Sequence, residues 1–214
     1  MANDLQDDLL TSAPVTPLAA ALAGQARTTA EREAAVAAPE KTRSTAHAAP
    51  RCPPPLSEAL LAAYRASDFQ VSAAPRLHLR IGARSPAAAA LLAEYQADRA
   101  ILLTAWNPFS EPREFAENEQ RQRALHACLL DVGLTMLPAL GVDPSGEWPA
   151  EESVFAFGAS AACTDRLLER FEQNAAVVVE ADGSVHLQLH PRLRLTDASS
   201  LLDRRSIETL NRYA

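Results

Sequence analysis

The chain has 214 residues and a net charge of −7, from 20 basic and 27 acidic residues. This length suits one domain with extensions or two small domains. An acidic balance argues against broad nucleic-acid binding, which needs a basic face, so no nucleic-acid partner is expected.

The three cysteines are scattered along the chain, at Cys52, Cys128 and Cys163, without a C-x-x-C pair. An odd, scattered set is a poor disulfide framework, which fits a reducing compartment. The first ten residues are acidic where a secretory signal would be basic, and Leu18–Ala23 is too short to cross a membrane. We therefore expect a cytoplasmic protein, and its arginine and alanine richness suggests a GC-rich genome.

Residues 1–55 differ in composition from the rest of the chain. They hold 7 of the 15 prolines and no aromatic residue, the first being Tyr64. Such a segment buries too little apolar area to offset its chain entropy, so we expect a disordered Ala/Pro-rich tail. The proline-rich stretch Pro50–Pro55 then marks a domain boundary. A core domain over 56–192 and a C-terminal extension over 193–214 follow, the latter with a helix expected at Ser200–Arg212.

The core domain shows alternating helix and strand patterns. Helices are predicted at Glu58–Ala66 after a Ser57 cap, from Pro86 to Ala97, at Arg113–Val132 and at Ala159–Phe171. Strands are predicted at Phe69–Ser72, Arg76–Gly82, Ala100–Ala105, Leu134–Leu140 and Ser153–Gly158, and as a hairpin of Ala175–Glu180 with Ser184–His190. Alternation in the middle combined with antiparallel signals at both ends predicts an α+β domain, a mixed β-sheet covered by helices.

Polar residues gather where the apolar strand Ala100–Ala105 gives way to the following helix. Asn107 and Ser110 lie in the connecting loop, and helical spacing turns Asn118 and Arg121 back towards it. Unpaired N–H groups at the start of that helix favour an anion or a carbonyl group. Asn107 and Ser110 are also ordinary turn and cap residues, so a structural role for the whole set competes with ligand binding.

Two further polar sets lie near later strands. Glu151 and Ser153 follow Trp148, and either could reach Arg121 across the sheet, with an ion pair at the floor of the site. Equally, Trp148 could simply cover the core and the glutamates be solvated. Gln173 and Asn174 separate a helix from a strand, where Asn174 could instead be a left-handed helix cap.

Familiar catalytic and cofactor motifs are missing from the sequence. There is no GxGxxG, GxxxxGK[ST], GxSxG or HExxH pattern, and we expect no cofactor. His186 and His190 share a strand face about 13 Å apart, too far for one metal ion, and are interpreted as solvent-facing. No metal site is predicted.

Spaced motifs resemble those of the bacterial family known as domain of unknown function 3293. They are T-A-W-N-P-x-S, Asn118 with Arg121, W-P-x-E-x-S and F-x-Q-N-A, and the resemblance covers Ala62–Glu180. It implies small cytoplasmic proteins without an established activity. Glu172 departs from the pattern, since similar sequences often have glycine there. The positions that match are Thr104, Trp106, Asn107, Ser110, Asn118, Arg121, Trp148, Glu151, Ser153, Gln173 and Asn174.

Two functions remain open from the sequence. The first is binding of a small anionic or nucleotide-like ligand by Asn107, Ser110, Asn118, Arg121, Glu151, Ser153 and Gln173. If the protein is an enzyme, Glu151 is the candidate base. The second is a non-catalytic protein-interaction module that uses the tail, where Leu5, Leu9 and Leu10 could form a short amphipathic helix on a partner.

Overall fold

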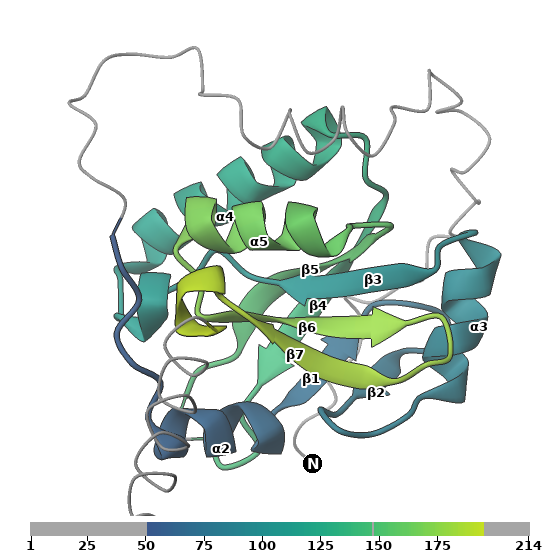
Figure 1. The fold of residues 1–214 in the computed structure, drawn as a ribbon, viewed down its shortest axis with the longest axis horizontal. Coiled ribbons are helices and arrows are strands. Elements are labelled where there is room, and N and C mark those ends of the chain that lie inside the picture. Colours follow the sequence, from purple (N-terminus) through teal and green to yellow (C-terminus); the bar gives the residue numbers. More distant parts are fainter. Residues whose placement is uncertain (1–50, 147, 195–214) are drawn as a thin grey trace, which may run out of the picture.

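The computed structural model describes residues 51–146 and 148–194. Most of the predicted tail, and the helix predicted at Ser200–Arg212, lie outside the described residues. Within them the chain forms one seven-stranded sheet with helices on both of its faces (Figure 1).

The strands follow the order β2-β1-β4-β5-β3-β6-β7, and every neighbouring pair is antiparallel. Their bounds are β1 Asp68–Val71, β2 Leu77–Leu79, β3 Arg99–Leu103, β4 Met136–Val142, β5 Glu151–Phe157, β6 Ala175–Glu180 and β7 Val185–Leu189. The helices are α2 Glu58–Ala66, α3 Pro86–Glu94, the single turn η2 Pro108–Ser110, α4 Phe115–Asp131 and α5 Ala161–Phe171.

The central unit runs β3-α4-β4-β5-α5-β6 along the chain. In the sheet, β5 lies between β3 and β4, and β3 lies between β5 and β6. Each helical connection therefore joins two strands of the same direction that are separated by one antiparallel strand. Two interlocked split β-α-β units of this kind make the ferredoxin-like arrangement. The pair β1–β2 extends one edge of this unit, and β7 extends the other.

The α+β prediction is confirmed, whereas the sheet differs from the mixed sheet that we expected. Alternation of strands and helices usually signals parallel neighbours. Here each helix crosses over an intervening strand, so strands of equal direction never pair. β3 is buried on both faces as predicted, because it lies near the middle of the sheet with helices on each side.

One face of the sheet is covered by α4 and α5, seen above the strands in Figure 1. Leu125 and Leu129 of α4 and Leu167 and Leu168 of α5 are fully buried there, against strand residues such as Ile101. The predicted apolar stripe of α4 is thus confirmed. Cys128 and Cys163 are buried in the same layer, and neither forms a disulfide.

The opposite face is covered by two short helices at its two ends. Ala88 and Leu92 of α3 are buried against one end of this face. The helix α2 lies at the other end and has no fully buried residue, although Ser57 caps it as predicted. The sheet face under α2 is therefore less completely packed. None of the helices in residues 51–146 and 148–194 is long and apolar enough to cross a membrane.

Candidate functional site

The chain leaves the sheet after β3, and side chains take over its backbone hydrogen bonds. Ala105 N donates to Gln122 Oε1 at 2.9 Å, and Trp106 N donates to Thr104 Oγ1 at 3.0 Å. Asn107 N donates to Asn118 Oδ1 at 2.9 Å. These buried or half-buried N–H groups would otherwise be unpaired, at a cost of about 1–3 kcal/mol each.

The carbonyl groups of the same segment are held in the same way. Arg121 Nε donates to Ala105 O at 2.8 Å, and its Nη2 donates to Phe171 O at 2.6 Å. Gln173 Nε2 donates to Trp106 O at 2.9 Å. Five consecutive polar groups, from Ala105 N to Asn107 N, therefore each have a side-chain partner, and the segment is rigidly placed.

The segment continues into a strained loop, Asn107–Ser110, in which three residues adopt the left-handed (positive φ) backbone conformation. Asn107, Phe109 and Ser110 have φ of 46°, 51° and 63°, and Phe109 N donates to Glu172 O at 2.6 Å. For residues other than glycine such conformations cost about 1–2 kcal/mol each, and they gather at functional sites. The hydrogen bonds around the segment hold it in this conformation.

Glu172 closes α5 in the left-handed conformation, with φ of 54°. It occupies the position where glycine is common in the similar sequences, and the tight turn forms nevertheless. The left-handed cap that we considered for Asn174 therefore falls on Glu172. Asn174 Nδ2 instead donates to Ser110 Oγ at 3.0 Å.

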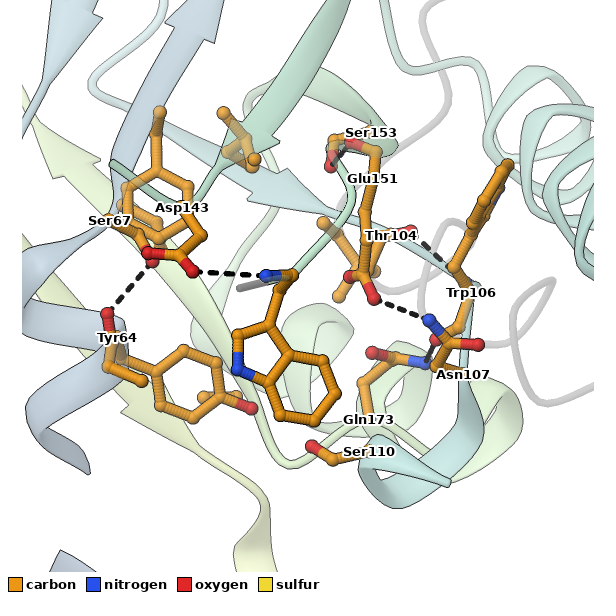
Figure 2. Close-up of a pocket in the computed structure, with 18 of the residues that line it drawn as sticks. Tyr64, Ser67, Thr104, Trp106, Asn107, Ser110, Asp143, Glu151, Ser153 and Gln173 are labelled. Atoms are coloured by element: carbon orange, nitrogen blue, oxygen red, sulfur yellow. Dashed lines mark hydrogen bonds between the residues drawn. The ribbon is translucent and has the colours of Figure 1, made fainter. Parts of the chain in front are cut away.

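This scaffold presents the amide of Asn107 to a buried carboxylate. Asn107 Oδ1 accepts from Asn118 Nδ2 at 2.9 Å and from Arg113 N at 3.0 Å, which fixes the orientation of the amide. Asn107 Nδ2 then donates to Glu151 Oε1 at 2.6 Å (Figure 2). Glu151 is the first residue of β5, two residues earlier than the strand predicted from the sequence.

Burial raises the pKa of the Glu151 carboxyl, and the hydrogen bond from Asn107 opposes that rise. No basic side chain contributes to the shift. Its second oxygen, Oε2, accepts no hydrogen bond from the described residues. A half-buried carboxylate with one free oxygen and a raised pKa can accept a hydrogen bond or a proton from a bound molecule.

The Glu151 carboxylate faces a cavity of about 170 Å³ between α2 and the sheet. The cavity lies on the face opposite α4 and α5, over the strand ends where β3 and β4 leave the sheet. A cavity of about this size can hold one aromatic ring. Its walls are mainly apolar and aromatic, and none of the described lining residues is basic. The lining includes Leu60, Tyr64, Phe69, Leu102, Thr104, Trp106, Asn107, Ser110, Asp143, Trp148, Glu151, Ser153, Gln173, Val177 and Leu187.

Tyr64 of α2 lies across the cavity from Asn107 and Glu151 in Figure 2. Burial raises the pKa of its phenol, and the nearby side chains of Ser110 and Asn174 lower it. Tyr64 thereby brings α2 close to the strained loop over Asn107–Ser110. Asp143 accepts from Ser145 N at 3.0 Å and from Trp148 N at 3.1 Å, so it holds the loop that carries Trp148.

The predicted site residues divide into two groups. Asn107, Ser110, Glu151, Ser153 and Gln173 line the cavity, although Ser153 Oγ donates only at 3.3 Å to the carbonyl of Glu151. Asn118 and Arg121 are not among the cavity-lining residues, and both instead hold the loop from behind.

The ion pair considered between Arg121 and Glu151 does not form. Arg121 lies 4.0 Å from the carboxylate of Glu172 and is otherwise committed to two backbone carbonyls. Burial lowers the pKa of its guanidinium, which Glu172 partly offsets. Arg121 is therefore a structural cation at this site.

Several cavity residues were missed by the sequence analysis. Tyr64, Phe69 and Asp143 lie in other elements, far from the polar cluster in sequence. The amphipathic pattern of α2, with Leu60 and Tyr64 on one side, was the available signal that its apolar face covers something. Gln122 was not assigned a role from the sequence, yet it is buried and its Oε1 accepts from Ala105 N.

Histidines contribute no metal site among the described residues, where no group of three or more His, Cys, Asp or Glu could hold an ion. The solvent-facing interpretation holds for exposed His186 but not for His190. His190 is 1% exposed and lies edge-on to the Phe109 ring, with centroids 5.8 Å apart. It follows β7 directly, where the chain turns back under the strained loop.

Comparison with known proteins finds one family that is similar to part of the chain. Residues 103–176 match the model of a family described as protein of unknown function (DUF3293). No curated protein and no solved structure matches the chain significantly. The match is shorter than the predicted resemblance over Ala62–Glu180, and it contains the loop after β3, α4, Glu151 and Gln173 but not α2. Over residues 103–176 the chain is therefore similar to the DUF3293 family.

Proposed function

We propose that this domain binds a small molecule in the cavity between α2 and the sheet. The observation that supports it best is the pair of Asn107 and Glu151, a buried carboxylate oriented by a rigid amide at the wall of an apolar cavity. Ligand sites combine such apolar walls with few, well-fixed polar groups. A carboxylate buried only for stability would be costly, because burial disfavours its charged form.

The backbone strain beside the cavity supports the same proposal. Three left-handed residues other than glycine follow β3, and the first of them, Asn107, is held by Asn118 of α4. Strain of this kind persists where the surrounding structure over-determines it, and it commonly fixes a functional group. Here the group that it fixes is the Asn107 amide.

The charge of the cavity changes the kind of ligand expected. The anionic or nucleotide-like ligand was expected from N–H groups at the start of α4 together with Arg121, whose guanidinium is occupied by Ala105 O and Phe171 O. With Glu151 and Asp143 in the described lining and no basic residue there, a phosphate group would meet like charge. A molecule without a phosphate or carboxylate is favoured.

The proposal is tested by a thermal-shift screen of small metabolites against the full chain. Ala175→Leu adds side-chain volume at the cavity wall, and Ala162→Leu on the exposed start of α5 is its matched control. A ligand of this cavity raises the melting temperature of the wild type and of Ala162→Leu, but not that of Ala175→Leu. Ligands that stabilise all three proteins equally bind elsewhere and contradict the proposal.

The tail-based interaction module stays a prediction, because Leu5, Leu9 and Leu10 lie outside the described part of the chain. One contact bears on it: Arg51 pairs with Glu111 at 2.6 Å and lies over the Phe109 ring. Binding of a partner protein that survives removal of residues 1–55 would exclude this alternative. A bacterial, cytoplasmic setting likewise stays a prediction.

A further inference from the structure

The walls of the cavity carry a chemical preference of their own. Three aromatic side chains face the cavity, Trp148 at its mouth and Tyr64 and Phe69 from α2 and β1, whereas the ring of the lining residue Trp106 packs edge-on against Phe115. The faces of aromatic rings carry partial negative charge and attract organic cations, most strongly where water is excluded. Trp148 is 56% exposed, so its ring remains available at the mouth.

Within the described part of the chain, no cation pairs with the carboxylate of Glu151. The Asn107 amide donates a hydrogen bond to Glu151 Oε1, and no described residue donates one to Oε2. Asp143 differs, since both of its oxygens accept hydrogen bonds from its own loop. Glu151 is thus the carboxylate whose remaining oxygen can face a bound molecule.

An inorganic cation suits this cavity less well than an organic one. Calcium takes six to eight oxygen ligands, and magnesium needs an octahedral set. The lining offers one carboxylate with a free oxygen among mainly apolar side chains. A methylated ammonium group instead presents an apolar surface to the rings while its charge faces the carboxylate.

We propose that the ligand of this cavity is a small organic cation, with an alkylated ammonium group held between the aromatic walls and Glu151. This inference rests on the proposed function and deepens it by naming the ligand class. The Asn107 amide keeps the carboxylate in place, and α2 with Tyr64 covers the bound group.

The test is a titration of the full chain with choline and with 3,3-dimethylbutan-1-ol, in which a neutral carbon replaces the ammonium nitrogen. Isothermal titration calorimetry reports binding, because it leaves both tryptophans of the chain in place. We expect choline to bind at least about tenfold more tightly than the alcohol. Glu151→Gln, which keeps an acceptor for Asn107, should remove that difference, whereas Glu152→Gln on the exposed neighbouring position should not.

Each outcome separates this inference from the proposed function. Equal binding of choline and the alcohol, both lost in Ala175→Leu, overturns the cation inference and leaves the ligand cavity standing. A preference for choline that persists in Glu151→Gln also overturns it, because a group other than Glu151 then recognises the positive charge. If neither compound binds at millimolar concentration, the cation inference fails, and the proposed function fails with it only if the metabolite screen is also empty.

Discussion

The substitution Asn118→Ala tests whether α4 holds the loop after β3. It removes the acceptor of Asn107 N and the donor to Asn107 Oδ1, both at 2.9 Å. Asn118 is 2% exposed, so water cannot freely replace its amide. Two lost hydrogen bonds, one leaving an unpaired N–H, should lower the free energy of unfolding by about 2–4 kcal/mol.

Urea denaturation measures this loss directly. With a slope of about 2 kcal/mol per molar urea, the midpoint should fall by about 1–2 M. Gln120→Ala, on the exposed side of the same helix, is the control and should stay within about 0.5 kcal/mol of the wild type. Asn118→Asp keeps the acceptor for Asn107 N but turns an oxygen towards Asn107 Oδ1, so it should also be destabilising. If Asn118→Ala unfolds at the wild-type midpoint, the loop is not held as described.

Three further predictions concern neighbouring features. A lysine at position 121 cannot donate to two carbonyls in the fixed geometry of a guanidinium. Arg121→Lys should therefore lose about 1–3 kcal/mol of unfolding free energy, measured in urea, whereas Arg123→Lys at an exposed position should not. Gly183→Ala would place its Cβ 2.4 Å from a backbone carbonyl oxygen, whereas Gly146→Ala meets nothing within 4 Å; both have positive φ. A melting temperature that falls no further for Gly183→Ala than for Gly146→Ala would contradict that packing. Because burial raises the folded pKa of Glu151, its ionised form destabilises the fold above the unfolded pKa. Glu151→Gln should therefore match the wild type in stability at pH 4 and exceed it as the pH rises through the raised pKa, and an equal difference at every pH would refute this.

Much of the secondary structure could be predicted because periodicity and caps are local signals. The stripe of Leu125 and Leu129, the Ser57 cap and the Asp-Gly turn of the hairpin each depend on residues close in sequence. Strand order does not, since β3 pairs with β5 and with β6 across whole helices. The alternation of strands and helices that suggested a mixed sheet is the same whether a helix joins two adjacent strands or two strands separated by a third.

The candidate site was predicted in part for a related reason. Helical spacing correctly turned Asn118 and Arg121 towards the loop, but spacing cannot tell a backbone partner from a ligand. Arg121 could be assigned to Ala105 O and Phe171 O only once β3 and α5 were seen side by side. Tyr64 could not be placed at all, because α2 is brought to the site by β1, which pairs with β4 far away in the sequence.

The most direct measurement is the pKa of Glu151 in the full chain, by NMR of carboxyl-labelled glutamate, with the signal assigned by its absence in Glu151→Gln. The structure predicts a value above the usual one of about 4.3, and a fall when choline is added in excess, since a cation beside the carboxylate favours its charged form. A Glu151 that titrates at the usual value, unmoved by every ligand of the screen, would show that its carboxylate is solvated and faces no ligand cavity.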